Sequence, residues 1–521
     1  MSAPVFFPVP VARKAGGAEG VQALIRQGES AEGPGDCFRL DEHTWKQMGG
    51  MLADERERFI GLWCDQVRVL AVLDQGTDRP LAAALELEGP RYPALSDSVP
   101  AAETFERMIS DLFGVDAMGG CDGSVLLDRG GWTVSAPLSS RPGPGGGAQD
   151  TGGDTACEQS VLSGPADGVS AAPFCLRMLK DGLRVQRSET LRGFAHRGVA
   201  QQMSGAVPGD AVRIAGRVCA ASSAAHQWAF CRAAEQISGV RPGERAMLCR
   251  AVFAETERCL THLATLSRVA RLAGSGLVSS RLAGLREALV QILTGLTGSR
   301  SLMDRIVPGG IYLPVSQGTA EGEIVRAVAV LAAEYAALLT QTLPGLRDLW
   351  RTRLGPEALL AGCGPAGEDV CHDNGVDGPA ARAAGRERDS RVFLPVYGRF
   401  RIPVQKGGDA RARCLQYFAE CRSSGALLSS LSGRLSELVE DAPLSFPGQG
   451  GDGWGYGKAA GPAGEVHMVI RMRQGRIDQV MIRNPSMLLI PLADSLASGV
   501  FPEEAALIRA SLGFSAAAAD L

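Results

Sequence analysis

The chain has 521 residues, a length that predicts two or three domains with a sizeable buried core. Its formal net charge of -4 and pI near 6.0 give no reason to expect a nucleic-acid partner. Thirteen cysteines, none spaced as C-x-x-C, indicate cytosolic free thiols rather than a disulfide framework. Neither a secretory signal nor an apolar run long enough to span a membrane is expected.

The first part of the chain is predicted to hold a small α+β domain. Residues 1–36 are rich in Gly, Ala and Pro and are expected to be a flexible N-terminus. Within residues 37–138, apolar patterning predicts two strands and a short helix, at 66–73, 81–87 and 102–113. Residues 139–160 have the Gly- and Pro-rich composition of a linker, so the domain boundary is placed there.

The second domain, residues 161–521, is predicted to be mainly α-helical. Apolar residues recur at helical spacing in four long segments, 244–273, 277–297, 320–343 and 408–439. Asp409 is the expected N-cap of the last segment. These segments predict a helix bundle, with peripheral β-hairpins near 174–185 and 464–486. The predicted fold class is therefore α+β, a small α+β domain fused to a long-helix bundle.

The glycine-rich run Gly450–Gly457 has a composition that could suggest a phosphate cradle. It lacks the Lys-Ser/Thr of a P-loop and its strand-to-helix context, so it is predicted to be a flexible loop.

Motifs in the second domain point to a known family. In chain order they are Arg217-Val218-Cys219 with His226, Arg241-Pro242 with Glu244-Arg245-Ala246, Glu255-x-Glu257-Arg258 with His262-Leu263, and Gly378-Pro379-x-x-Arg382-Ala383-x-Gly385. This order resembles the large subunit of membrane-bound nickel–iron hydrogenases of the formate hydrogenlyase and hydrogenase-4 type. It also resembles their relative, the hydrogenase-derived core subunit of respiratory complex I.

The first domain carries a resemblance of its own. Tyr92-Pro93-Ala94-Leu95 and the run Phe105–Val115, which reads Glu-Arg-x-x-x-Asp-Leu-Phe-Gly in its middle, are similar to the complex I subunit beside the hydrogenase-like one. In formate hydrogenlyase-type large subunits this module is fused ahead of the hydrogenase-like domain, and the same order is found here.

The resemblance implies two C-x-x-C pairs that hold nickel and iron, but the chain departs from that pattern. The four positions are Cys219, Ser222, Ser515 and Ala518. Because nickel in such a site needs four thiolates, hydroxyls and a methyl do not replace them. A Ni-Fe centre is therefore not expected, and the six scattered histidines form no other metal-ligand spacing.

The resemblance also places six charged residues around the old metal cavity: Glu255, Glu257, Arg258, Arg382, Asp389 and Arg391. They are candidates for a buried network that relays protons or couples to membrane subunits, and a set of structural ion pairs remains an equal alternative. Cys219 and His226 mark the vestigial cavity. A packed thiol and a satisfied core histidine are the alternatives there.

The leading hypothesis is a subunit of a membrane-associated redox complex, hydrogenase-like and NADH-quinone oxidoreductase-like, that supports electron transfer and energy coupling without nickel. Its implied partners are an iron–sulfur small subunit, whose 4Fe-4S cluster would lie near the Cys219 loop, and antiporter-like membrane subunits. The expected location is cytoplasmic, peripheral on the inner membrane through those partners. Whether the chain is itself an enzyme stays open.

Two other hypotheses remain. One is a catalytic subunit that reduces a quinone or another small acceptor in the vacated cavity. The complex I histidines that line the quinone site fall here at Asp167 and Ala171, which puts quinone binding of that kind in doubt. The other is a non-catalytic assembly or structural subunit, because function lives in the site and this site has changed.

Overall fold

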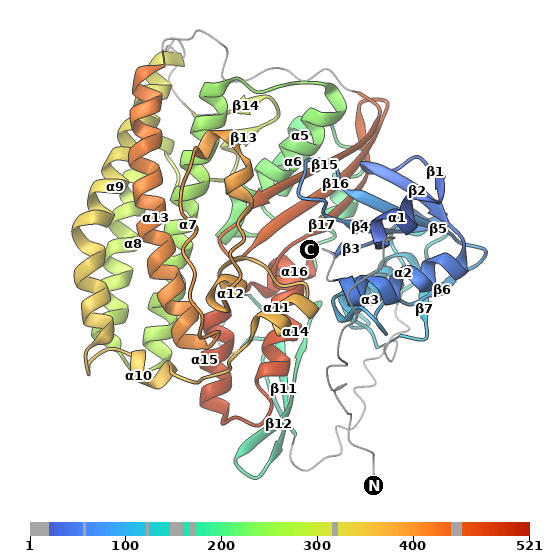
Figure 1. Ribbon diagram of the computed structural model, residues 1–521, viewed down its shortest axis with the longest axis horizontal. Coiled ribbons are helices and arrows are strands. Elements are labelled where there is room, and N and C mark those ends of the chain that lie inside the picture. Colours follow the sequence, from blue (N-terminus) through green and yellow to red (C-terminus); the bar gives the residue numbers. More distant parts are fainter. Residues whose placement is uncertain are drawn as a thin grey trace.

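The structure is a computed structural model that describes residues 20–55, 59–120, 124–145, 160–166, 172–314, 321–438 and 451–521. A bundle of long helices forms one side of the molecule and a smaller β-rich domain the other, with a three-stranded sheet between them (Figure 1). The α+β fold class, with a small domain fused to a mainly helical one, is confirmed.

The small domain is built on a five-stranded sheet in the order β1-β2-β5-β4-β3, in which only β2 and β5 run parallel. Its elements are α1 (Val21–Arg26), β1 (Glu29–Ser30), β2 (Asp36–Leu40), α2 (Glu42–Glu55), β3 (Phe59–Cys64), β4 (Arg68–Leu73), β5 (Leu81–Glu86) and α3 (Glu103–Phe113). Strands β3 to β5 are almost wholly buried and therefore read as continuous apolar runs. The two strands and the helix expected here are confirmed.

The expectation of a flexible N-terminus is wrong for residues 20–36. Val21 and Ile25, four residues apart on one face of α1, are completely buried in the core of the small domain. Residues 1–19 lie outside the described residues, as do residues 146–159 of the predicted linker. Shorter strand pairs close this domain: β6 (Arg91–Pro93) with β7 (Asp116–Met118), and β8 (Val134–Ser135) with β9 (Gly143–Pro144).

The bundle contains the four predicted long helices. They are α7 (Glu244–Leu272), α8 (Gly276–Thr297), α9 (Glu321–Arg351) and α13 (Ala410–Glu437). Helix α13 packs on both α9 and α7, and α8 packs on α7 and α9. Asp409 caps α13, accepting a hydrogen bond from the Ala412 backbone N–H at 2.7 Å, as expected. Helix α9 continues past its predicted end at residue 343, with Pro344 inside it.

The central sheet corrects the prediction of a flexible loop at Gly450–Gly457. From Gly453 onward this run is strand β15 (Gly453–Ala460), which pairs with β16 (Glu465–Arg473) and, through it, with β17 (Arg476–Arg483). A Cβ added to Gly455 or Gly457 would lie 2.1 or 2.0 Å from a carbonyl oxygen of α6 (Ser223–Ser238). The glycines therefore let the strand lie directly against the helix. Gly450 lies outside the described residues.

The remaining elements surround the bundle and the sheet. The helices are α4 (Val199–Met203), α5 (Pro208–Ala215), α10 (Glu357–Leu360), α11 (Glu368–Asp373), α12 (Gly378–Ala383), α14 (Ser486–Leu496), α15 (Pro502–Leu512) and α16 (Ala516–Asp520). The strands are β10 (Ser160–Ser163), β11 (Cys175–Asp181), β12 (Arg184–Leu191), β13 (Ile306–Val307) and β14 (Gly310–Ile311). Strands β11 and β12 confirm the hairpin expected near residue 180, and β16 and β17 confirm the second one.

A buried ion pair joins the two domains. The Lys458 ammonium of β15 lies 3.0 Å from a carboxylate oxygen of Asp74, which follows β4, and both side chains are almost fully buried. Arg388 approaches the other oxygen of Asp74 at 3.4 Å. Because unpaired buried charges are costly, these contacts fix how the small domain sits on the sheet. Among the described helices, none is long and apolar enough to cross a bilayer.

Candidate functional site

Three of the four positions that the resemblance assigns to metal ligands meet in one buried place. Cys219 and Ser222 flank a 3-10 turn before α6, and Ser515 immediately precedes α16. The Cys219 thiol lies beside the Ser222 and Ser515 side chains, and burial raises its pKa. Ala518, in α16, is completely buried. The site therefore presents one protonated thiol among small neutral groups.

His226 lies one helical turn beyond Ser222 and uses both ring nitrogens. Its Nδ1 is 2.7 Å from the Ser222 carbonyl oxygen, which can only accept, so Nδ1 carries the hydrogen. Its Nε2 then accepts from the Asn484 amide at 3.1 Å. Burial lowers the pKa of the imidazole to about 4. His226 is thus a neutral, fully hydrogen-bonded core residue.

Asn484 links His226 to Ser515. Its side-chain oxygen accepts from the Ser486 N–H at 2.8 Å, and the Ser486 hydroxyl accepts from the Ser515 N–H at 3.0 Å. This chain of hydrogen bonds holds the start of α16 against the start of α6, so the closeness of Cys219 and Ser515 needs no metal to bridge them.

Glu257 lies apart from the other charged candidates. Its two carboxylate oxygens accept from the backbone N–H groups of Ala224 and Ala225 at 2.7 and 3.2 Å, at the first turn of α6. Complete burial raises its pKa to about 7, although these backbone donors act in the opposite direction. Glu257 is therefore the candidate whose protonation changes near neutral pH.

The other five candidates come together in what we call the buried charge cluster. It consists of Glu255, Arg258, Arg382, Asp389 and Arg391, with Glu420 and His262 added by the structure. Arg391 binds Asp389 through two nitrogens, at 3.0 and 2.6 Å, and reaches Glu255 at 2.8 Å. The cluster joins α7 and α13 to the segment that follows α12.

Glu420 of α13 completes the cluster from its other side. It accepts from Arg382 at 2.8 Å, and its second oxygen lies 2.9 Å from the His262 ring nitrogen. Arg258 lies 3.6 Å from Glu420 and 3.5 Å from Glu255. Three guanidinium groups thus face three carboxylates.

Electrostatics keep the carboxylates of the cluster ionised. Burial alone would raise the pKa of Asp389, but Arg391 and Arg382 outweigh it and hold the pKa at about 2. The same balance of burial against arginines lowers the pKa of Glu255 and places that of Glu420 well below its usual value. Burial also lowers the pKa of His262, so the ring is neutral. The cluster therefore has no net charge at neutral pH.

Sequence reasoning did not select Glu420 or His262 as members of the cluster, nor the pair Asp74 and Lys458. A signal for Glu420 exists, because Arg413, Gln416, Glu420 and Ser424 recur at spacings of three or four, on the buried side of α13. No comparable pattern marks Asp74 and Lys458, since they come from different domains.

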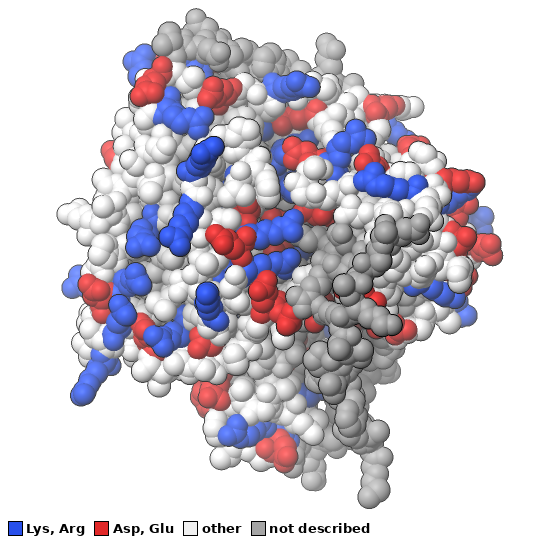
Figure 2. Space-filling model, viewed as in Figure 1, with Lys and Arg blue, Asp and Glu red and all other residues white. Residues whose placement is uncertain are grey.

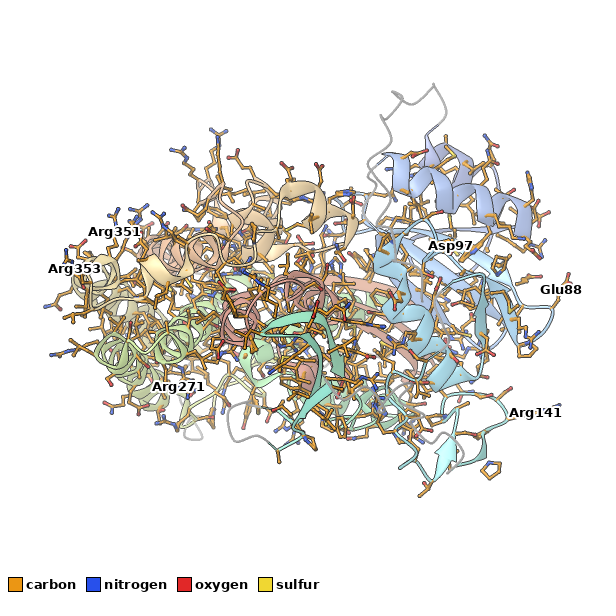
Figure 3. The ribbon with its side chains drawn as sticks, turned by 90° about the horizontal axis from the view of Figure 1, so that it is seen from below. Glu88, Asp97, Arg141, Arg271, Arg351 and Arg353 are labelled. Carbon is orange, nitrogen blue, oxygen red and sulfur yellow. The ribbon has the colours of Figure 1, made fainter. Side chains whose placement is uncertain are left out.

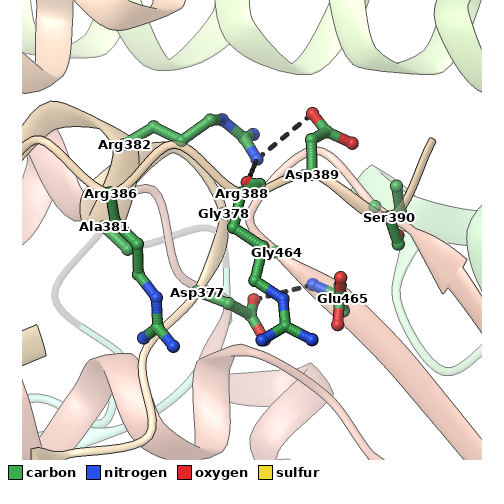
Figure 4. A pocket seen from close by; sticks show the side chains of 12 residues that line it. Asp377, Gly378, Ala381, Arg382, Arg386, Arg388, Asp389, Ser390, Gly464 and Glu465 are labelled. Carbon is green, nitrogen blue, oxygen red and sulfur yellow. Dashed lines mark hydrogen bonds and ion pairs between the residues drawn. The ribbon is translucent and has the colours of Figure 1, made fainter. Parts of the chain in front are cut away.

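A small pocket, open to solvent on one side, lies beside the cluster. Figure 4 shows Arg382 extending toward Asp389 at the upper edge of the pocket, with the Arg386 and Arg388 side chains below it. Neither Cys219 nor Ser515 lines this pocket. The space next to the cluster is thus lined partly by charged side chains and is separate from the vestigial ligand positions.

One group in the described part of the chain has the spacing of a metal site. Ligand atoms of Asp377, Glu465 and His467 all lie within 4.8 Å of one another. The Arg483 guanidinium donates to the Asp377 carboxylate at 2.8 Å and to the Glu465 carbonyl at 2.9 Å. Arg483 therefore already supplies a cation to the Asp377 carboxylate, and we assign no metal to this group.

The chain is similar to several known proteins. A family model described as "Respiratory-chain NADH dehydrogenase, 49 Kd subunit" matches residues 277–447. Formate hydrogenlyase subunit 5 of Escherichia coli is 24% identical over 349 residues, which cover 64% of this chain and 60% of that protein. An NADH-quinone oxidoreductase subunit of Campylobacter concisus is 26% identical over 271 residues, 50% of this chain and 64% of that one.

Two further proteins extend the comparison. A carbon monoxide-induced hydrogenase of Rhodospirillum rubrum is 26% identical over 276 residues, 52% of this chain and 73% of that protein. A chain in the structure of a membrane-bound sulfane sulfur reductase, an archaeal respiratory membrane complex, shares the fold with a TM-score of 0.61 and 22% identity, over 70% of this chain and 98% of that one.

The resemblance to hydrogenase-like and complex I core subunits is therefore confirmed. This chain spans less than two thirds of the length of formate hydrogenlyase subunit 5 and of the Campylobacter protein.

Proposed function

We propose that this chain, a relative of hydrogenase-like and NADH-quinone oxidoreductase subunits, is a core subunit of a membrane-associated redox complex and works without nickel. The observation that carries the proposal is the packing of Cys219 against the Ser222 and Ser515 side chains. A nickel–iron site needs four soft thiolate ligands, and a single buried thiol with a raised pKa does not supply them.

The residues present do not fit a Ni-Fe centre, so we assign no nickel chemistry to this chain. Electron transfer would instead depend on a 4Fe-4S cluster held by an iron–sulfur small subunit next to the Cys219 loop. Antiporter-like membrane subunits would be the other partners and would hold the chain at the cytoplasmic face of the inner membrane. These partners follow from the resemblance and are part of the proposal.

The buried charge cluster would serve energy coupling in a specific way. Its carboxylates have pKa values held below their usual range, so they do not exchange protons near neutral pH. They do connect α7, α13 and the 389–391 segment through paired charges in a dry interior. Such a network favours rigid transmission of movement between helices and loop over proton relay.

Reduction of a quinone or another small acceptor in the vacated cavity has less support. The pocket beside Arg382 is lined in part by charged side chains and does not reach Cys219 or Ser515. Asp167 and Ala171, where the complex I histidines would stand, lie outside the described residues. Reduction of a soluble quinone analogue by the purified complex, lost on substitution of a residue lining that pocket, would favour this alternative.

The decisive experiment is metal analysis of the complex purified through a tag on this chain. We expect iron in the amount that a co-purifying iron–sulfur subunit accounts for, and no nickel. A parallel sample supplied with nickel during growth controls for limiting metal. Stoichiometric nickel, or hydrogen turnover, would overturn the nickel-free assignment, and migration of the chain as a lone monomer would count against the complex.

A further inference from the structure

One corner of the helix bundle combines exposed arginines with exposed leucines. It is the lower end of the bundle in Figure 1, where α7 turns into α8 and α9 is followed by α10. Seen from below, Arg271, Arg351 and Arg353 are labelled at this end, far from Glu88 of the small domain (Figure 3). We call this corner the bundle end, formed by Arg271, Leu277, Arg347, Arg351, Arg353, Leu354 and Leu359.

The leucines of the bundle end are unusually open to solvent. Leu277, Leu354 and Leu359 are 51%, 64% and 62% exposed. They belong to the first turn of α8, the turn after α9, and α10, so they come from two separate connections of the bundle. Three such side chains at one corner expose apolar surface that the folded chain leaves uncovered.

Exposed arginines share this end of the bundle with the leucines. Arg271, Arg347 and Arg353 are exposed and form no ion pair with any residue in the described ranges. Arg351 has only a long contact, 3.8 Å, with Glu357, which is also bound by Arg411 at 3.1 Å. Figure 2 shows Lys and Arg over the neighbouring face of α9 and α13 down to this corner, with acidic side chains between some of them.

We propose that the bundle end rests directly on an anionic lipid surface. The leucines would enter the boundary between headgroups and acyl chains, while the arginines, on long apolar stems, keep their guanidinium groups at the phosphates. A projecting corner suits insertion into a soft surface, whereas docking of an acidic protein needs a complementary face. The inference rests on the proposed function only in requiring a membrane nearby, and it adds a contact made by this chain itself.

Vesicle flotation of the purified full-length chain tests the proposal. We expect binding to vesicles of phosphatidylcholine with phosphatidylglycerol, loss of binding on added salt, and little binding to phosphatidylcholine alone. The variant R271Q/R347Q/R353Q should bind the anionic vesicles at least about tenfold more weakly. The variant L354S/L359S, which leaves charge unchanged, should also bind more weakly but keep its salt dependence.

The control variant R326Q/R399Q/R401Q removes the same charge from exposed positions elsewhere on the bundle and its adjoining loop, and should bind nearly as the native chain does. All variants should keep the native Tm, because the altered side chains are exposed. Equal weakening by the control variant, or absence of binding to anionic vesicles, would overturn the proposal. The proposal would also be overturned if R271Q/R347Q/R353Q lost an acidic partner subunit while its binding to vesicles stayed unchanged. Metal analysis is independent of these outcomes, so a failure here leaves the proposed function standing.

Discussion

The positions around Cys219 and the buried charge cluster around Arg391 are both in the interior of the large domain, yet they are built in opposite ways. The first holds a thiol, two hydroxyls and a methyl, all neutral. The second holds three arginines and three carboxylates, each within 3.6 Å of an opposite charge. The chain thus lacks the metal donors that the resemblance places there but has a complete set of paired charges.

This difference shows which of the two regions the fold depends on. Small neutral groups lose little when they are buried, provided that each finds a hydrogen bond. Buried charges are stable only together, because removal of one partner leaves the other without compensation in a dry interior. Substitutions should therefore have large effects in the cluster and small ones around Cys219.

The largest effect is expected from Arg391→Met in the cluster. This change leaves Glu255 and Asp389 without their nearest cation and should lower the free energy of unfolding by roughly 3–5 kcal/mol. Urea or thermal unfolding of the purified chain measures it. The matched control is Arg300→Met, which breaks an exposed pair with Glu287 and should cost less than about 1 kcal/mol. Equal losses in the two variants would show that the buried cluster depends on its paired charges no more than an exposed ion pair does.

A second prediction concerns pH and Glu257, which lies beside the vestigial ligand positions. Its pKa is about 7 in the folded chain and 4.5 in a free side chain, so between these values the folded state binds the extra proton. The contribution of this group to the free energy of unfolding is fully present below pH 4.5. It is lost as the pH rises toward 7, by up to about 3 kcal/mol. Glu257→Gln should flatten this slope in unfolding measured across that range.

The cluster should respond to pH with the opposite sign. Asp389 has a pKa of about 2, against 3.8 for a free aspartate, so its stabilisation is present above pH 3.8 and is lost as the pH falls toward 2. Glu257→Gln should leave this acid limb unchanged. If Glu257→Gln instead altered the acid limb while the slope between pH 4.5 and 7 persisted, the assignment of the two groups would be wrong.

Sequence reasoning found the long helices and the central strands because apolar residues repeat with helical or strand spacing over many residues. It also grouped Glu255 with Glu257, although residues two apart on a helix point about 200° away from each other. Because of that rotation, Glu255 points into the buried charge cluster and Glu257 points to the first turn of α6. The glycines at 455 and 457 were misread because their reason, the approach of α6, is a tertiary contact with no local pattern.

The smallest effect is expected from Cys219→Ala. Loss of the sulfur leaves a small cavity beside two hydroxyls, which should cost roughly 1–2 kcal/mol. Cys249→Ala, which removes a fully buried thiol on α7, away from Cys219, is the matched control and should cost about the same.

The metal content of the purified complex decides what that small cost means. If Cys219 is a packed thiol, Cys219→Ala and Cys249→Ala should both leave the iron content unchanged, because the partner subunit would hold the 4Fe-4S cluster. If Cys219 were a ligand, its thiolate would have to form despite burial, and its loss alone would lower the bound metal. A fall in iron or nickel confined to Cys219→Ala would therefore assign the vestigial positions a surviving role in metal binding, and the contrast with the charge cluster would no longer hold.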